Sequence, residues 1–121
     1  MTKMEIANIV KNKLIENINP KLIVLFGSLA NGNEREESDI DLLVVWDEKV
    51  ELTNIKRRII LRKIIGIIDS PLDILTCTTN ELNKALEDKN SFTSQIVTEG
   101  ELIYGRFNWL FQMVKSGRTG F

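Results

Sequence analysis

Two short, uninterrupted aliphatic runs constrain the fold of this 121-residue chain more than any other feature. The first begins at position 21 and reads KLIVLFGS, and the second begins at position 39 and reads DIDLLVVW. Apolar runs of this length are typical of strands that are buried on both faces of a sheet. A third run, PLDILTCT from position 71, has the same character. We therefore expect a small sheet that is covered by helices.

An amphipathic helix is expected before the first run. Residues 2–18 open with Thr2 and Glu5, which stand at the spacing of a capping box. Apolar residues then recur at every fourth position as far as Ile18, which gives one continuous stripe. Pro20 cannot continue a helix, so we expect the helix to end just before it.

A crossover helix is expected over residues 52–68, between the second and third runs. Ile55 and Ile59 recur there at helical spacing. We expect these isoleucines to face the sheet and the basic residues around them to face solvent, although such a basic run can also meet phosphates or an acidic partner.

Two short helices and one more extended segment are expected after the third run. Thr78 and Glu81 form a possible capping box at the start of a helix that reaches about residue 89. A second short helix is expected over 91–100, followed by an edge strand or turn over 101–104.

This order of elements predicts a single α/β (α+β) domain over residues 1–121, with a small mixed sheet flanked by helices. We expect its core over residues 20–105. The tail over 106–121 is rich in apolar and aromatic residues. It is expected either to cap the core or to dock on a partner or a second subunit, which allows a homo-oligomer.

Composition excludes several classes of protein. The net charge is −1, so direct binding to nucleic acid is not expected. The chain has no histidine, which removes histidine-based catalytic triads and almost every type of zinc site. Its one cysteine, Cys77, has no partner for an internal disulfide and is expected to be an inert core residue. We expect a cytoplasmic protein, because neither a signal peptide nor a membrane-spanning run is evident.

Two aspartates, Asp39 and Asp41, stand where the polar loop meets the second run. Residues two apart on a strand point to the same face, so these carboxylates should project together while Ile40 enters the core. Two ionised carboxylates held this close repel one another, and a divalent cation between them removes the conflict. Carboxylate oxygens suit Mg²⁺, which otherwise keeps waters and substrate phosphates as ligands.

A third carboxylate, Asp73, interrupts the third apolar run. If the second and third strands are neighbours, Asp73 can face the other two aspartates and complete a metal site for phosphoryl transfer. A simpler explanation for each aspartate taken alone is that it is a solvated residue at the end of a strand.

Gly27 and Ser28 follow the first run directly. A glycine allows a ligand to approach the backbone closely. A helix that begins here would offer free N–H groups to a phosphate, and the Ser28 hydroxyl would add a donor. The pattern therefore predicts a phosphate on the Gly-Ser turn beside a metal on the strand that carries Asp39 and Asp41.

These residues resemble the signature of the DNA polymerase beta-like nucleotidyltransferase superfamily. That signature is a strand, Gly-Ser, a short helix and a strand in which two aspartates alternate with apolar residues; here it reads LFGSLANGNEREESDIDLLVV. The chain is most similar to the minimal nucleotidyltransferase (MNT) class, which is often paired with a HEPN-type toxin. The resemblance covers residues 20–105 and implies the polymerase beta-like fold.

The resemblance implies a role for each site residue. Gly27 and Ser28 would hold the triphosphate of ATP. Asp39 and Asp41 would ligate Mg²⁺, and Asp73 would help to bind the metal and activate the attacking hydroxyl.

Two further residues follow from the same resemblance. Ser38 would shape the loop that enters the metal strand. At position 31 many minimal members carry arginine, whereas this chain has Asn31, which can donate hydrogen bonds to the nucleotide but brings no charge.

The resemblance implies a Mg²⁺-dependent enzyme that moves AMP from ATP to a hydroxyl. Since little of the chain lies beyond the predicted core, we expect a partner to supply the acceptor. The family implies a tyrosine of a HEPN RNase toxin, for which this chain would be the antitoxin. Two alternatives stay open: a binding module that neutralises its partner by contact alone, and a transferase of the aminoglycoside type.

Overall fold

The computed structural model describes residues 1–32 and 39–106 of the chain. Its centre is a four-stranded mixed sheet with the strand order β3-β2-β1-β4. The strands are β1 (Pro20–Phe26), β2 (Ile40–Trp46), β3 (Leu72–Cys77) and β4 (Glu101–Gly105). β2 pairs with β1 antiparallel and with β3 parallel, and β4 pairs antiparallel with the other side of β1. The small mixed sheet predicted from the sequence is therefore confirmed, with the segment after residue 100 as an edge strand.

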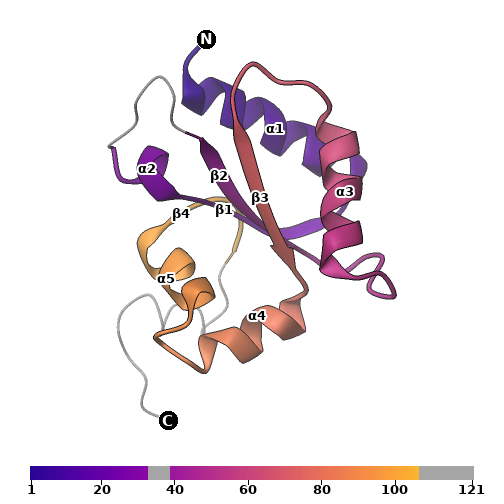
Figure 1. The fold of residues 1–121 in the computed structure, drawn as a ribbon, viewed down its shortest axis with the longest axis vertical. Helices are drawn as coiled ribbons and strands as arrows, with labels where there is room; N and C mark the ends of the chain where they lie inside the picture. The colour runs from indigo at the N-terminus through magenta and orange to yellow at the C-terminus, as the bar shows by residue number, and fades with distance from the viewer. Residues whose placement is uncertain (33–38, 107–121) are drawn as a thin grey trace.

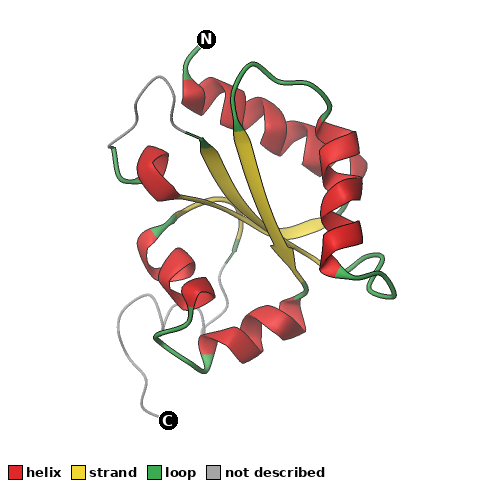
Figure 2. Cartoon of the chain, in the orientation of Figure 1, coloured by secondary structure: helices red, strands yellow, loops and turns green. Residues whose placement is uncertain are grey.

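Helices cover both faces of this sheet (Figures 1 and 2). They are α1 (Lys3–Asn17), α2 (Gly27–Ala30), α3 (Asn54–Ile65), α4 (Thr79–Leu86) and α5 (Phe92–Glu99). The larger hydrophobic cluster joins α1 and α3 to one face of the sheet, through residues such as Leu14, Leu42 and Leu61. The smaller cluster joins α4 and α5 to the other face, through residues such as Leu43 and Val97.

Local capping signals place the helix starts where the sequence predicts them. Thr2 and Glu5 form a complete capping box at the start of α1, and Thr78 and Glu81 form another at the start of α4. Each box satisfies backbone N–H groups that the first turn of a helix leaves without partners. α4 ends at Leu86, a few residues before the predicted end near 89.

The predicted orientation of α3 is wrong. Ile55 and Ile59 were expected to face the sheet, but their side chains are 65% and 48% exposed. The buried residues of α3 are Arg57, Leu61 and Ile65, which stand four apart on another side of the helix. The basic run therefore does not lie wholly in solvent, because one of its arginines belongs to the core.

Contacts of Arg57 explain this orientation. Its Nη2 donates to the carbonyl oxygen of Trp46, its Nε donates to that of Glu48 at 3.3 Å, and its Nη1 donates to Asn54 Oδ1 at 2.8 Å. The guanidinium Cζ also lies 4.6 Å from the centre of the Trp46 ring. Burial of a charge is tolerable where hydrogen bonds and an aromatic face replace water in this way.

None of the helices within the described ranges is both long and apolar enough to span a membrane. The predicted docking or capping role of the tail concerns residues 107–121 and, like Ser38, lies outside the described residues.

Candidate functional site

The candidate site lies at one end of the sheet, where three strands place side chains in a row. Phe26 of β1 is the register partner of Asp41 of β2, and Asp41 is the register partner of Asp73 of β3. Residues directly opposite one another on paired strands project to the same face. The expectation that the second and third strands are neighbours, with Asp73 beside Asp41, is thus met by the parallel pairing.

The row lies on the face that also carries α4 and α5. Leu43 and Val45 follow Asp41 at two-residue steps along β2, and both belong to the cluster packed against these helices. Ile40 and Leu42 point the other way, into the cluster with α1 and α3. Alternation along β2 therefore buries the apolar residues and leaves Asp41 at the open end of the α4/α5 face.

Gly27 lies directly against the carboxylate of Asp41. A Cβ added at Gly27 would overlap Asp41 Oδ2 and lie 3.1 Å from Asp41 Cγ. The backbone of Gly27 also has a φ of +75°, which residues with side chains rarely adopt. Two independent reasons therefore require glycine here, and both bring the turn after β1 against the acidic residue of β2.

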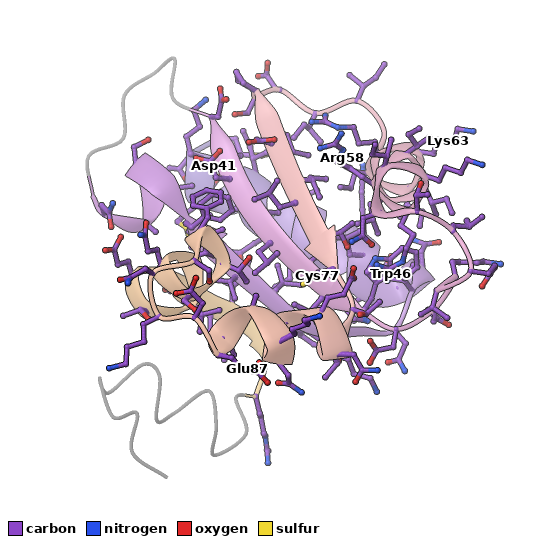
Figure 3. All side chains as sticks on the ribbon, turned by 60° about the horizontal axis from the view of Figure 1, so that its bottom comes forward. Asp41, Trp46, Arg58, Lys63, Cys77 and Glu87 are labelled. Carbon is purple, nitrogen blue, oxygen red and sulfur yellow. The ribbon has the colours of Figure 1, made fainter. Side chains whose placement is uncertain are left out.

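Asp41 is the electrostatic centre of the site. Partial burial raises the pKa of its carboxyl group, and the negative charges of Asp73 and then Asp39 raise it further. Asp39 and Asp73 are both exposed, whereas Asp41 is half-buried. The charges of Asp73 and Asp39 therefore both reach Asp41 and disfavour the ionised form of its carboxyl group (Figure 3 shows Asp41 at the end of β2).

The donor chemistry of this group fits Mg²⁺. Asp41 and Asp73 are carboxylates on adjacent strands, Asp39 directly precedes β2, and the repulsion that Asp73 and Asp39 exert on Asp41 is of the kind that a divalent cation removes. Within residues 1–32 and 39–106, however, no three acidic, histidine or cysteine side chains are grouped closely enough to enclose a metal ion. The three-carboxylate metal site stays a prediction, in which Asp41 and Asp73 would form the nearest pair.

The other predicted residues lie around the turn after β1. Ser28 is half-buried in α2, the single-turn helix that begins at Gly27. Asn31 is exposed at the end of α2, where its backbone N–H donates to the carbonyl oxygen of Gly27 at 3.2 Å. The turn thus brings Gly27, Ser28 and Asn31 to the same end of the sheet as Asp41.

An aromatic cleft beside this turn was missed by the sequence analysis. It has a volume of about 150 Å³ and lies between the turn and α5, with Phe26, Gly27, Asn31 and Phe92 among its lining residues. The rings of Phe26 and Phe92 meet edge to face, with centroids 6.2 Å apart, and Phe92 is 62% exposed. The only signal in the sequence is an aromatic residue at the start of a short helix, which does not reveal its neighbours.

Comparison with known proteins agrees with this geometry. Residues 6–108 match the sequence model of a family described as "Polymerase beta, Nucleotidyltransferase". The protein adenylyltransferase MntA of Shewanella oneidensis is 32% identical over 95 residues, which are 77% of this chain and 61% of the relative. A candidate protein adenylyltransferase of Methanocaldococcus jannaschii is 31% identical over 101 residues, which are 83% of this chain and 92% of the relative. The chain thus spans less than two thirds of the Shewanella protein.

Solved structures give the same result. A chain in a toxin–antitoxin crystal structure with AMP-PNP has a TM-score of 0.61 and 28% identity, with 91% of this chain and 81% of that chain covered. A chain in a crystal structure of a MntA–HepT toxin–antitoxin has a TM-score of 0.57 and 25% identity, with 95% and 82% covered. The expected fold and the expected family are therefore both confirmed.

Proposed function

The chain belongs to the polymerase beta nucleotidyltransferase family, and from this premise we propose that it transfers AMP from ATP to a hydroxyl of a partner protein. The observation that carries the proposal is the row of Phe26, Asp41 and Asp73, with the bare backbone of Gly27 against the Asp41 carboxylate. Relatives named as protein adenylyltransferases, and a similar chain crystallised with AMP-PNP, support both the reaction and the nucleotide.

The nucleotide would lie across the turn after β1. The first backbone N–H groups of α2 and the Ser28 hydroxyl are available donors for the β- and γ-phosphates. Asn31 would add an uncharged donor at the end of the same turn. The exposed ring of Phe92 borders the cleft next to Gly27 and offers a flat surface on which a purine can stack.

The carboxylates would hold the reacting groups together. Asp39, Asp41 and Asp73 would bind Mg²⁺, which when present neutralises phosphate charge and the repulsion among them. Asp73 would also orient the attacking hydroxyl and accept its proton, and it can pass that proton to water because it is exposed.

The transfer itself exchanges one bond for another. The acceptor oxygen forms a bond to the α-phosphorus while the bond from that phosphorus to the bridging oxygen of the β-phosphate breaks. Pyrophosphate leaves with the bonding electron pair, and the hydroxyl proton goes to Asp73. Positioning and charge neutralisation supply most of the rate in reactions of this class.

We place the acceptor on a tyrosine of a HEPN-type toxin, for which this protein is the antitoxin. The support comes from the relatives, two of which are crystallised as toxin–antitoxin assemblies. Attachment of AMP would then inactivate the toxin, and the protein would act as an enzyme rather than by staying bound to the toxin.

Transfer of label tests the proposal. The protein is mixed with Mg²⁺, ATP labelled at the α-phosphate and a HEPN-type toxin, and label on the toxin is expected. Asp41→Asn and Asp73→Asn should each lower the rate at least about a hundredfold while the fold is kept. Near-normal transfer by Asp41→Asn would falsify the assignment.

Two other results would favour the alternative functions. Neutralisation of the toxin without label would favour a module that acts by contact alone. Transfer to an aminoglycoside in the absence of any protein partner would favour a small-molecule transferase.

A further inference from the structure

An open groove runs along β3, the edge strand of the sheet, beside the face that carries Asp41 and Asp73. It has a volume of about 300 Å³, and its lining comes from β2, β3, α3 and α5. Leu43 and Leu75 form the floor, Thr93 lies on the α5 side, and Ile55 and Arg58 lie on the α3 side. Leu43 is only 3% exposed because it packs with α4 and α5, whereas Leu75 is half-buried and Ile55 is exposed, so the groove is open to a partner along β3 and the start of α3.

Strand alternation places the two leucines of the groove on the face that carries the carboxylates. Leu43 follows Asp41 by two residues on β2, and Leu75 follows Asp73 by two residues on β3, so all four side chains share one face. Leu43 and Leu75 are themselves register partners. Two residues along a strand span about 7 Å. A chain lying in the groove can therefore extend one side chain as far as the carboxylates.

The α3 side of the groove is both apolar and positively charged. Ile55 is 65% exposed, which leaves an apolar contact available at the rim. Residues 54–65 include five lysines and arginines and no acidic residue. Arg57 is buried, and Arg62 donates to the carbonyl oxygen of Leu72.

Arg58 is the cation that faces the groove. Figure 3 shows it between α3 and β3, whereas Lys63 of the same helix points away from the sheet. Arg58 has neither a hydrogen-bond acceptor nor a carboxylate partner within residues 1–32 and 39–106. Its charge is therefore free to pair with an incoming acidic group.

We propose that this groove holds the acceptor segment of the protein partner, an inference that rests on the proposed function. The segment is extended and carries an apolar residue, the hydroxyl-bearing tyrosine and a neighbouring acidic residue. The apolar side chain packs on Leu75 and Ile55, and the acidic side chain pairs with Arg58. The tyrosine hydroxyl then reaches Asp73, where its oxygen attacks the α-phosphorus and its proton is accepted.

Synthetic peptides test this recognition directly. One peptide places leucine before a tyrosine and glutamates after it, and its counterpart replaces the glutamates by lysines. With the wild-type protein, Mg²⁺ and ATP, we expect the acidic peptide to be labelled about tenfold faster. Arg58→Glu should abolish or reverse this preference.

Lys63→Glu is the matched control, because it makes the same charge change on the same helix at a side chain that points away from the sheet. It should retain the preference for the acidic peptide. On a whole HEPN-type toxin, Arg58→Glu should raise KM for the toxin about tenfold and leave kcat and KM for ATP within about twofold. Replacement of the paired acidic residue of the toxin by lysine should restore a low KM for the toxin to the Arg58→Glu variant.

Failure of this inference is distinguishable from failure of the proposed function. If the wild type labels the toxin but Arg58→Glu and Lys63→Glu behave alike, the groove assignment is overturned while the transferase activity stands. Labelling of the toxin with no transfer to either peptide also overturns it, since recognition would then lie outside the groove. Competition by RNA would also overturn the inference if Arg58→Glu relieved that competition without changing the peptide preference. The basic side of α3 would then bind a nucleic acid.

Discussion

At the scale of single residues, the site depends on Gly27 having no side chain. Substitution by alanine places a Cβ on the Asp41 carboxylate and forces a φ of +75° on a residue that disfavours it. Gly27→Ala should lower the free energy of unfolding by about 1–3 kcal/mol, as backbone strain of this kind does. It should also turn the Asp41 carboxylate away, so that AMP transfer falls and Mg²⁺ no longer stabilises the protein.

Gly66 supplies the matched control for this substitution. It has a φ of +69° at the end of α3, but a Cβ there would meet nothing within 4 Å. Gly66→Ala should therefore lose stability in urea denaturation yet keep its response to Mg²⁺. If both variants kept that response, the contact between Gly27 and Asp41 would have no part in metal binding.

The raised pKa of Asp41 predicts how stability depends on pH in the absence of metal. The folded protein binds a proton at this carboxyl more tightly than the unfolded chain, whose ordinary pKa is 3.8. Ionisation of Asp41 therefore lowers stability as pH rises through the folded-state pKa, and the effect disappears below 3.8. In EDTA at about pH 7, Asp41→Asn should melt at a higher temperature than the wild type.

Two comparisons check the origin of that difference. The melting temperatures of Asp41→Asn and the wild type should converge as pH falls below 3.8. Addition of Mg²⁺ near neutral pH should raise the melting temperature of the wild type alone. A variant that melts no higher than the wild type in EDTA would mean that neither burial nor the neighbouring aspartates appreciably destabilise the ionised Asp41 carboxylate.

The pKa of Cys77, the single cysteine, agrees with the inert role predicted for it. Burial raises the pKa of its thiol to about 12, with the charge of Glu81 as the next cause. The reactive thiolate is therefore almost absent near neutral pH.

At the scale of elements, the position of α3 depends on Arg57. Arg57→Leu would leave the carbonyl oxygens of Trp46 and Glu48 without their donor, and each buried unsatisfied group costs about 1–3 kcal/mol. We expect a loss of about 2–4 kcal/mol in the free energy of unfolding, measured in urea. Lys56→Leu, a change of the same kind at the exposed neighbouring position, should stay within about 0.5 kcal/mol of the wild type. Equal stability of the two variants would show that the polar contacts of Arg57 make no net contribution.

The same helix shows where sequence reasoning succeeds and where it fails. Capping boxes and apolar runs are local, so the starts of α1 and α4 and the positions of β1, β2 and β3 could be predicted. The buried side of α3 could not, because an arginine was assigned to solvent while its partners, the carbonyl groups at and just after the end of β2, are set by tertiary packing. Ile55 and Ile59 were consequently placed on the wrong side.

The same distinction between local sequence signals and tertiary packing applies to the candidate site. The spacing of Asp39 and Asp41 predicts a shared face, which stays a prediction because Asp39 precedes β2, and Asp73 could be placed beside Asp41 only on the condition that β2 and β3 are neighbours. The groove over Leu43 and Leu75 and the cleft beside Phe92 depend on where α3 and α5 lie relative to the strands. No short-range pattern in the sequence encodes those distances.

At the scale of the whole molecule, metal and nucleotide should bind cooperatively. ATP alone brings further negative charge to three mutually repelling carboxylates, and Mg²⁺ alone has few phosphate ligands to share. Together they should stabilise the fold by about 2.7 kcal/mol at a hundred times the dissociation constant. The rise in melting temperature with both should exceed the sum of the separate rises, and Asp41→Asn should lose this excess. Strictly additive rises in the wild type would argue against a shared site.

The two hydrophobic clusters have a consequence for how proteins of this kind diversify. Every member of the larger cluster, on the α1/α3 face, lies away from the row of carboxylates and from the floor of the groove. If the groove recognises the partner, substitutions that alter recognition fall along the edge strand β3 and the start of α3, while most of the buried core stays unchanged. A duplicated copy of such a gene can acquire a new target through a few changes at Leu75, Ile55 and Arg58, while the buried residues that stabilise the fold are kept.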